Sequence, residues 1–556
     1  MVNLVLITVK ILKVLSNSLL SAVYLAWLLA LLVLTVNINA RADLSELILL
    51  VMSLAVVYGL PVLIVCAIAF FSLQFFSGKQ FRIRFVSPSF LAVSFSVITF
   101  LFLYVFRQNI KYFEAFFDGR MRPLIVFQAV LLLVWAVLAP AAFFLFHRTG
   151  KKPLVFIAAF ILFAGIVFGV AKARMSFPEI TESSKSASLP ARKIDKNIHV
   201  LGFEGKSFDF LIPLMSEGKL PNFSWLAENG AWGKLEGFSP NESFVLNASF
   251  NTGKWPSKHR QLSLFDYTLT WSPLKLDVVP RFMFIRQLSR IGYLQTARRE
   301  PAPVVTDIWR ILEDNGSAYL RRDRQAGECP APTERAEKGF DHFLQDESAA
   351  GSYFHDQARK AFFCDWDYEE KAFADRAQIQ PTLSHILLGG LNTVQSIFYK
   401  YSFPDLFGNI LQEDINRHGS MIERYYAFCD QIVGKYLASL KDEEILVVYS
   451  PFGVEPLPLW KRFVEGLQGN SEISAHHEDA PEGVVFFYGK GIRKGRTVEG
   501  MTIVDIAPTL LYCFGLPVGK DMDGIVISEI FLRDYTAENP VFYISSYEEI
   551  AVSPAR

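Results

Sequence analysis

Apolar residues crowd into the first third of the chain, and nearly all acidic residues follow it. Five stretches are long enough to cross a hydrocarbon core of about 30 Å, which takes roughly 20 residues, and none of them contains Lys, Arg, Asp or Glu. They run approximately Leu15–Val36, Leu47–Phe76, Phe85–Phe106, Pro123–Phe146 and Pro153–Ala171. The pattern predicts about five transmembrane helices over residues 1–177, with the lipid bilayer as a partner. The first stretch is too long for the apolar core of a cleaved signal peptide.

The charges that flank these stretches predict a topology. One side carries Lys10, Lys13, Lys79, Arg82, Arg84, Arg148, Lys151 and Lys152, and the other carries Arg41, Arg107, Lys111, Arg120, Arg122, Lys172 and Arg174. Because cytoplasmic loops are enriched in Lys and Arg, this small excess favours an N-terminus inside. After five spans, the rest of the chain would lie on the outer (periplasmic or extracellular) side. The segment Asn109–Phe117 predicts a short amphipathic piece at that outer interface.

A polar, aromatic-poor stretch from Pro178 to Lys196 predicts a linker, and the pattern changes after it. Short apolar runs typical of buried strands then alternate with helical patterns, which predicts a mostly parallel or mixed sheet covered by helices on both faces. The predicted strands are Ile198–Gly202, Gly233–Gly237, Ile445–Tyr449 and Gly483–Tyr488, and the predicted helices are Ser207–Met215, Asn222–Asn229, Ile422–Leu440 and Ile503–Phe514. In such folds the chemistry collects at the carboxyl ends of the strands.

Composition narrows the function classes only a little. The net charge is zero, with 55 Lys and Arg against 55 Asp and Glu, so no basic surface indicates a nucleic-acid partner. The five cysteines show neither zinc-knuckle nor CxxC spacing. Cys66 lies in a predicted span, and Cys429 and Cys513 are expected in the core. For Cys329 and Cys364, a disulfide and two free thiols both remain open.

Several segments of residues 197–530 carry a resemblance to a known family. In chain order they read IHVLGFEGKSFDF, SPNESFVLNASFNTGKWPSKH, LGGLNTVQS, ERYYAFCDQIVGKYLASL, EILVVYSPFGVEP, EGVVFFYGKGI and MTIVDIAPTLLYCFGLPVGKDMDG. In order and spacing they resemble the alkaline phosphatase superfamily, and within it the type I phosphodiesterase and nucleotide pyrophosphatase branch. The resemblance implies one α/β domain over residues 197–556 with a mostly parallel sheet between helices.

The resemblance also implies a catalytic site. Active members use two divalent metals, usually zinc, held by Asp and His, to activate a Ser or Thr nucleophile and to neutralise charge on the group transferred. Counting back from Thr252-Gly253 places the nucleophile position at Ser243, for which an N-cap role is an equal alternative. The first metal-ligand position falls on Glu204, a carboxylate where the family has Asp.

The remaining ligand positions of the family are largely replaced. The Asp and His of a "DTVQH" motif become Asn392 and Ser396, and the Asp and His of "SDHG" become Pro451 and Phe452. A last histidine is kept as His476 or His477. His355 (beside Asp356), His385 and His418 are weaker candidates for a compensating ligand. His259 and the Asp523-Gly524 pair resemble structural features of the family.

Neither metal centre keeps the three strong protein ligands that a catalytic zinc needs, so we expect zinc to be absent or weakly bound. The first hypothesis is therefore a membrane-anchored pseudoenzyme that binds, scaffolds or assembles with protein partners. The second is a phosphodiesterase or phosphoryl-group transferase acting on a lipid or surface glycan with a residual or relocated metal. The third is a structural subunit of a larger membrane complex.

Overall fold

The computed structural model describes residues 2–77, 84–146, 165, 194, 196–299, 304–323, 333–344, 353–467, 470–478 and 480–548. They fall into two compact units. The helical unit comprises Met1–Thr181 and Pro256–Ala302, and the α/β unit comprises Glu182–Trp255 and Pro303–Arg556. The predicted fifth span, apart from Gly165, and nearly all of the predicted linker lie outside the described residues.

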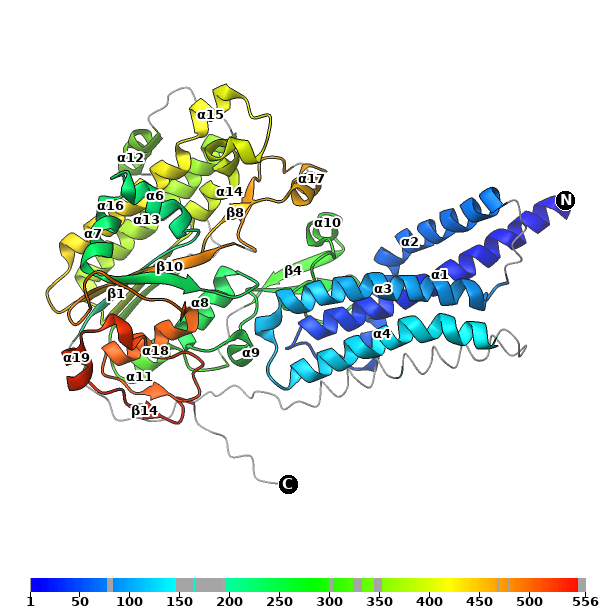
Figure 1. Cartoon of the computed structure of the whole chain (residues 1–556), viewed down its shortest axis with the longest axis horizontal. Helices are drawn as coiled ribbons and strands as arrows, with labels where there is room; N and C mark the ends of the chain where they lie inside the picture. Colours follow the sequence, from blue (N-terminus) through cyan, green and yellow to red (C-terminus); the bar gives the residue numbers. More distant parts are fainter. Residues whose placement is uncertain are drawn as a thin grey trace. The chain divides into compact units, whose positions relative to one another are not determined.

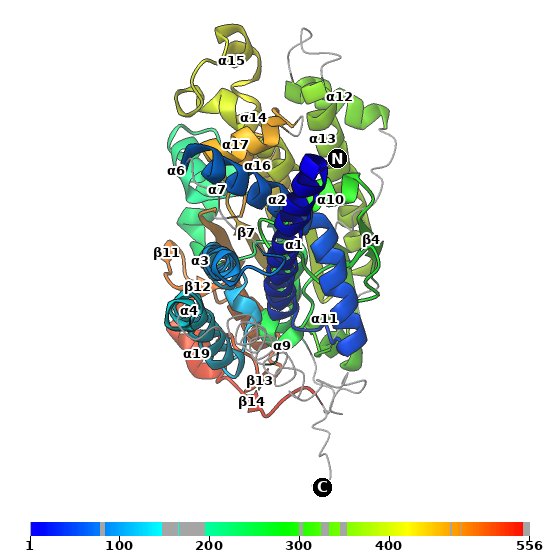
Figure 2. The same cartoon turned by 90° about the vertical axis from the view of Figure 1, so that its right-hand side faces the viewer.

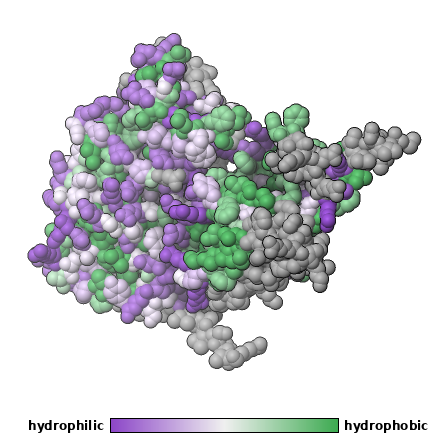
Figure 3. Space-filling view, turned by 45° about the vertical axis from the view of Figure 1, so that its right-hand side comes forward, coloured by the Kyte–Doolittle hydropathy of each residue, from purple (hydrophilic) through white to green (hydrophobic). Residues whose placement is uncertain are grey.

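The helical unit begins with four long helices: α1 (Val2–Val36), α2 (Leu44–Ser77), α3 (Pro88–Tyr112) and α4 (Met121–Phe146) (Figure 1; Figure 2 views them from the side of the N-terminus). In the described part of the chain, these 4 helices are long and apolar enough to cross a membrane. They match four of the predicted stretches, and they make the chain a candidate multi-pass membrane protein. Green patches on the face seen in Figure 3 mark apolar side chains that this unit exposes.

Small and hydroxylated side chains hold the first three helices together, as is usual where lipid removes the hydrophobic drive for association. The Tyr24 hydroxyl lies 2.5 Å from Oγ1 of Thr99. A Cβ added to Gly59 on α2 would lie 3.0 Å from Cβ of Ala22 on α1, so the two backbones approach closely. The helices therefore form a packed bundle.

Residues Pro256–Ala302, which the sequence placed in the α/β domain, belong instead to the helical unit. We call this segment the inserted lobe. It contains a short helix α9 (Pro256–His259), an antiparallel hairpin of β3 (Phe265–Leu269) and β4 (Leu294–Arg298), and a helical turn α10 (Ile285–Arg290). The predicted interfacial piece Asn109–Phe117 is the end of α3 followed by η1 (Glu114–Phe116), and its three phenylalanines are buried in protein.

The α/β unit is built on an eight-stranded mixed sheet of strand order β11-β2-β10-β7-β1-β6-β5, with β12 pairing on β2. Strand β1 lies between β6 and β7, and β5 pairs on β6, all in parallel, whereas β10 runs antiparallel to β7 and β2. The strands are β1 (Ile198–Phe203), β2 (Ala231–Glu236), β5 (Tyr319–Asp323), β6 (Leu383–Leu388), β7 (Ile445–Phe452), β10 (Glu482–Gly489), β11 (Arg496–Thr497) and β12 (Met501–Thr502). β1 and β6 are buried along their whole length, as expected of strands covered on both faces.

Helices cover both faces of this sheet, each over its own apolar core. One face carries α6 (Phe208–Ser216), α7 (Pro221–Asn229), α12 (Glu334–Leu344), α13 (Tyr353–Ile379), α14 (Gly390–Ser402) and α16 (Met421–Ser439). The other carries α8 (Ser243–Thr252), α11 (Ile308–Asp314) and α18 (Ile506–Cys513). The remaining elements are η3 (Pro404–Leu406), α15 (Gln412–His418), β8 (Glu455–Pro456), α17 (Leu459–Leu467), β9 (Ala475–His476), η4 (Ile503–Asp505), β13 (Val518–Gly519), η5 (Ser528–Ile530), α19 (Arg533–Glu538) and β14 (Tyr543–Ile544). The predicted fold class is confirmed.

Candidate functional site

The carboxyl ends of β1, β6 and β7 meet at one edge of the sheet, where backbone hydrogen bonds hold them together. The Glu204 N–H donates to Leu388 O at the end of β6 (2.9 Å), and the Gly205 N–H donates to Phe452 O at the end of β7 (3.2 Å). Glu204, the predicted first ligand, is thereby fixed between the ends of β6 and β7.

Ser450, the serine of the SPFG segment, strengthens this junction. Its Oγ accepts from the Lys206 N–H (2.9 Å) and donates to Phe452 O (2.8 Å). A Cβ on Gly205, at φ +94°, would lie 2.5 Å from Gln395 Oε1 and 3.2 Å from Asn392 Cα, so the loop after β1 lies against the first turns of α14. The structure thus brings the backbone of the Glu204-Gly205 pair, Asn392 and Phe452 together at one edge of the sheet.

Ser243, the predicted nucleophile position, is the first residue of α8, and Glu242 is the N-cap. The alternative reading of Ser243 as an N-cap serine is therefore wrong by one position. The loop before α8 contacts the predicted histidine segment, because Asn241 Nδ2 donates to His477 O (2.9 Å). Ser243 lies at the helix end where backbone N–H groups lack intrahelical partners, a position that favours anionic groups.

The two candidate histidines have different surroundings. His476 lies on β9, which pairs with β8; its Nδ1 accepts from the Glu478 N–H (3.2 Å) and its Nε2 lies 3.3 Å from a Glu455 carboxylate oxygen. The His477 ring instead stacks on Phe452, with 4.8 Å between ring centroids and 26° between planes. Of the two, His477 is the one that faces a replaced ligand position.

Phe452 is part of β7 in the structure, whereas the sequence predicts that this strand ends at Tyr449. Ser450 and Phe452 continue the ladder by pairing with Val484 and Glu482 of β10. The Phe452 side chain is buried, with 1% of its surface exposed. An apolar ring thus occupies a position to which the resemblance assigns a metal ligand.

Glu242, next to Ser243, lies within the electrostatic influence of two other carboxylates, one of which, Glu478, pairs with Lys461 (2.7 Å). The pKa of Glu242 is raised, first by desolvation of its carboxylate among neighbouring protein atoms and then by the like charges of Glu478 and Glu204. Part of the Glu242 side chain is still exposed to solvent. Burial lowers the pKa of His477, so its imidazole is neutral at pH 7 and offers no compensating charge.

The side chains at this edge do not fit two zinc ions. Pro451 and Phe452 have no donor atom, Ser396 Oγ donates to Thr393 O within its own helix, and His476 lies against Glu455. Among the residues that the structure describes, no three His, Cys, Asp or Glu side chains are grouped so as to hold a metal. The side chains with metal-donor atoms that remain at these positions are Glu204, Asn392 and His477.

Lys206 is a feature that sequence reasoning missed. It directly follows the Glu204-Gly205 pair, is fully buried, and places its Nζ 4.2 Å from the ring centroid of Tyr426, 4.8 Å from Phe203 and 5.3 Å from Phe223. Burial lowers its pKa, and burial raises the pKa of the neighbouring Cys429 thiol to about 11. The only sequence signal was a charged residue between a buried strand and a helix.

The other histidines of the sequence analysis lie away from this edge or are structural. His385, in the middle of β6, is buried, stacks on Phe250 and Trp309, and shares a hydrogen bond with the Tyr449 hydroxyl (2.9 Å). His418 is buried against Phe398 and Tyr401. His259 is buried in the inserted lobe, and the side chain of His355 lies outside the described residues.

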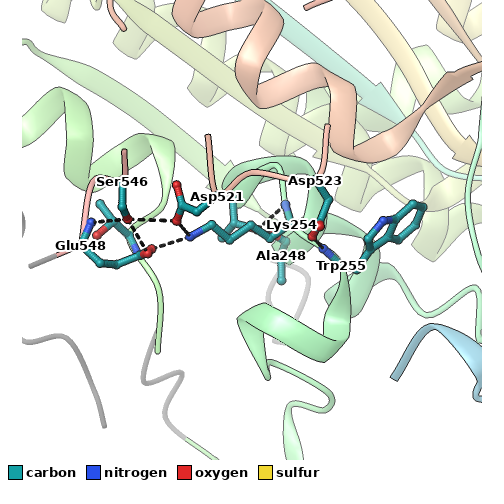
Figure 4. Close-up of polar contacts among 9 residues, drawn as sticks. Ala248, Lys254, Trp255, Asp521, Asp523, Ser546 and Glu548 are labelled. Carbon is teal, nitrogen blue, oxygen red and sulfur yellow. Dashed lines mark hydrogen bonds and ion pairs between the residues drawn. The ribbon is translucent and has the colours of Figure 1, made fainter. Parts of the chain in front are cut away.

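The opposite end of α8 is held by a charge cluster, drawn in Figure 4. The Lys254 side chain is only 5% exposed and places Nζ 2.6 Å from carboxylate oxygens of both Asp521 and Glu548, and Ser546 Oγ donates to these two carboxylates. Asp523 accepts from the Trp255 N–H (2.9 Å), and its own N–H donates to Gly253 O, which is the structural turn that the resemblance implies. This end of the helix is structural, which leaves the Ser243 end for any chemistry.

The cysteines follow the predictions where the structure describes them. Cys429 and Cys513 are buried and free, and Cys66 is free in α2. Cys364 on α13 is disulfide-bonded, and Cys329 lies outside the described residues.

The segments that carry the family resemblance fall in order on β1, α8, α14, α16, β7, β10 and α18. The α/β unit has the mixed, mostly parallel sheet between helices that the resemblance implies. No family model matches the chain, and no curated protein matches it.

Solved structures similar to the chain include murine ectonucleotide pyrophosphatase/phosphodiesterase 5, as an inactive variant in complex with AMP (TM-score 0.34, 13% identity, 58% of this chain and 96% of that chain). Another is the phosphonate monoester hydrolase from Silicibacter pomeroyi (TM-score 0.35, 14% identity, 60% of this chain and 76% of that chain). Similarity at this level assigns no residue, ligand or reaction to this chain.

Proposed function

We propose that this chain is a membrane-anchored pseudoenzyme with an alkaline-phosphatase-like unit that does not carry out two-metal hydrolysis and acts by binding or assembly at the membrane. The observation that carries the proposal is the buried Phe452 ring stacked on His477. An aromatic ring cannot donate an electron pair to a divalent metal as Asp or His does, and its bulk takes the space next to the one remaining neutral imidazole.

The charge at this edge supports the same conclusion. Two-metal hydrolysis depends on cations that neutralise the transferring group and stabilise the transition state by several kcal/mol. Here the like charges of Glu478 and Glu204 act on Glu242, and Lys461 pairs with Glu478 (2.7 Å). A phosphodiester anion at Ser243 would meet carboxylates and one lysine in place of two divalent cations, so its hydrolysis is disfavoured.

The second candidate is a phosphodiesterase or phosphoryl-group transferase that acts on a lipid or surface glycan. Ser243 at the first position of α8 and Glu204 at the end of β1 favour this reading, because a hydroxyl at a helix N-terminus and one carboxylate are kept. The third candidate, a structural subunit of a larger complex, shares with the first the expectation of no turnover.

Metal content and turnover separate the first two candidates. The full-length chain, purified in detergent without chelators, is assayed for zinc and manganese and for hydrolysis of bis(4-nitrophenyl) phosphate, beside Ser243→Ala. We expect neither stoichiometric metal nor Ser243-dependent hydrolysis. A matched variant restores the family's ligands (Asn392→Asp, Ser396→His, Pro451→Asp and Phe452→His) and should gain metal relative to the parent. Stoichiometric metal in the parent together with turnover that Ser243→Ala abolishes would overturn the pseudoenzyme proposal.

Partners separate the first and third candidates. The tagged full-length chain is recovered from native membranes in mild detergent, and co-purifying proteins are quantified by mass spectrometry. A stable complex of fixed stoichiometry would favour the structural subunit, whereas partners lost when the candidate edge is altered (Glu204→Lys) would favour binding through that edge.

We also propose that the α/β unit lies on the outer side of the membrane. The disulfide of Cys364 supports this side, because disulfides persist in oxidising compartments and are rare in the cytosol. Protease treatment of intact cells should cut the α/β unit only if it faces outward.

A further inference from the structure

The inserted lobe is joined to the helices by reciprocal hydrogen bonds from two buried asparagines. Asn37, just after α1, donates through Nδ2 to Val278 O (2.9 Å) and accepts from the Val278 N–H through Oδ1 (2.8 Å). Asn109, near the end of α3, does the same with Arg281, at 3.3 Å and 2.7 Å. Both asparagines are 0% exposed. Each side-chain amide thus hydrogen-bonds one backbone N–H and one backbone C=O of the lobe at a place that water does not reach.

Contacts of the lobe continue along the candidate spans. The lobe shares one apolar cluster with α1 and α2, which comprises Ala26, Leu29, Ala30, Val33, Leu34, Ala42, Leu47, Leu50, Val51 and Leu54 together with Leu269, Leu274, Leu276, Val279, Met283, Leu288 and Leu294. Ser53 Oγ donates to Thr270 O (2.7 Å), and the Tyr58 hydroxyl donates to Met283 O (2.6 Å).

The position of Tyr58 shows how far these contacts reach. At 1.5 Å per residue it lies about 21 Å along α2 from Leu44. Both residues belong to the candidate span Leu44–Ser72. Since a bilayer with its headgroups is only about 40–45 Å thick, the lobe contacts a part of α2 that the membrane itself is expected to surround.

The lobe also exposes large apolar side chains. Trp271 is 60% exposed, Phe284 58% and Ile291 70%, with Phe282 and Ile285 less so. Trp271 and Phe284 have φ of +70° and +52°, a backbone region that bulky residues rarely adopt. Large exposed apolar side chains that lie together mark surfaces that contact another molecule or a membrane.

Cations accompany these side chains. Arg286 and Arg290 lie on α10, beside Phe284 and Ile291, and the Arg281 guanidinium stacks over the Tyr112 ring at the end of α3 (4.4 Å). Aromatic side chains with neighbouring Arg are typical of the membrane–water interface, where rings lie at headgroup depth and guanidinium groups meet lipid phosphates.

We propose that the inserted lobe is a membrane-embedded element, with Trp271, Phe284 and Ile291 in the acyl region and Arg286 and Arg290 at the phosphates. The occupant of its apolar surface is the lipid bilayer, because that surface is continuous with helices long and apolar enough to span one. The chain of the α/β unit then enters a membrane-embedded element at Pro256 and leaves it at Ala302. These two connections add to the one that joins the α/β unit to the N-terminal spans. This inference is independent of whether the α/β unit binds metal.

The test places a fluorophore at two isoleucines of equal exposure. Ile291 in the lobe and Ile525 in the α/β unit are both 70% exposed. Each is changed to Cys in full-length protein that also carries Cys66→Ala, which removes the free cysteine that is not buried. Cys429 and Cys513 are buried, and the disulfide of Cys364 is kept oxidised. The Cys66→Ala protein without an added Cys measures background labelling. The probe is bimane, in nanodiscs of phosphatidylcholine and phosphatidylglycerol.

We expect the Ile291→Cys probe to emit at shorter wavelength, to lose intensity when the lipids carry doxyl groups on their acyl chains, and to resist aqueous iodide. The Ile525→Cys probe should show the reverse. Iodide quenching at both positions would overturn the proposal. Protection of the Ile291→Cys probe from both quenchers would also overturn it, because a protein partner or a second copy would then cover the lobe.

Trp271→Ala in the same background should raise iodide access at position 291 if lipid insertion is cooperative across the lobe, and an unchanged value would count against it.

Discussion

The ring of Phe452 lies on the imidazole of His477, 4.8 Å between centroids, at two positions that the family resemblance assigns to a metal site. Phe452 also extends β7 and accepts the Gly205 N–H through its carbonyl oxygen. Its ring and its backbone therefore both contribute to the packing of this sheet edge.

This packing predicts the cost of removing the ring. Phe452→Ala should lower the free energy of unfolding of the α/β unit by about 3–5 kcal/mol, the usual range for a buried phenylalanine. Phe542→Ala is the control, because that ring is 52% exposed and its removal should cost about 0.5 kcal/mol or less. Pulse proteolysis in urea measures both. Equal, small losses would mean that Phe452 contributes no packing at this edge.

Lys206 gives a prediction about pH. Its pKa is lowered by burial, so between the folded pKa and about 10.4 the unfolded chain binds more protons than the folded one. The free energy of unfolding contributed by this residue therefore rises with pH through that window. Lys206→Met, which keeps the stem's packing, should be more stable than the parent by about 1–3 kcal/mol at pH 7, and the difference should shrink towards pH 10.

The control for this measurement is Lys234→Met, since Lys234 is largely exposed and forms only a surface pair with Glu482. Its effect should be small and nearly independent of pH. A Lys206→Met effect that does not change with pH would show that the ammonium contributes nothing as a buried charge.

The parts of this fold that follow from local pattern could be predicted. The uncharged apolar runs of about 20 residues require helices in a bilayer, and four of them are the described long helices. Strands β1 and β7 were predictable as short apolar runs before polar loops. The ordered motifs placed Glu204, Asn392 and Phe452 at one edge because parallel strands bring their carboxyl ends together.

The remainder depends on contacts between distant residues. Asn37 and Val278 are separated by 241 positions, and nothing near either one indicates the pair. Extension of β7 to Phe452 depends on pairing with β10, which local sequence does not specify. The choice of His477 over His476 required knowing that Glu455 lies against His476. Predicting that Lys206 is buried would have required knowing where Phe223 on α7 and Tyr426 on α16 lie.

The Lys254 cluster predicts a large effect away from the candidate site (Figure 4). Lys254→Met leaves the Asp521 and Glu548 carboxylates, 30% and 19% exposed, without their cation. Removing one partner of a fully buried ion pair costs about 3–5 kcal/mol, and the partial exposure of these carboxylates places the expected loss near the lower end. Lys490→Met breaks an exposed pair with Glu443 and should cost about 1 kcal/mol or less. If the two losses in the free energy of unfolding are equal, the cluster does not anchor α8.

The asparagine contacts predict how the inserted lobe is held. Asn37→Leu keeps a similar volume but leaves the Val278 N–H and C=O without partners, at a cost of about 1–3 kcal/mol for buried groups. Backbone amides from Leu276 to Met283 should then exchange with deuterium faster in nanodiscs. Asn229→Leu removes an exposed hydrogen bond to Trp225 O in the α/β unit and should leave that exchange unchanged. Unchanged exchange in Asn37→Leu would mean that the apolar cluster alone holds the lobe. Faster exchange in Asn37→Leu and not in Asn229→Leu would assign the docking to the buried amide, because the two variants remove the same chemical group and only Asn37 contacts the lobe.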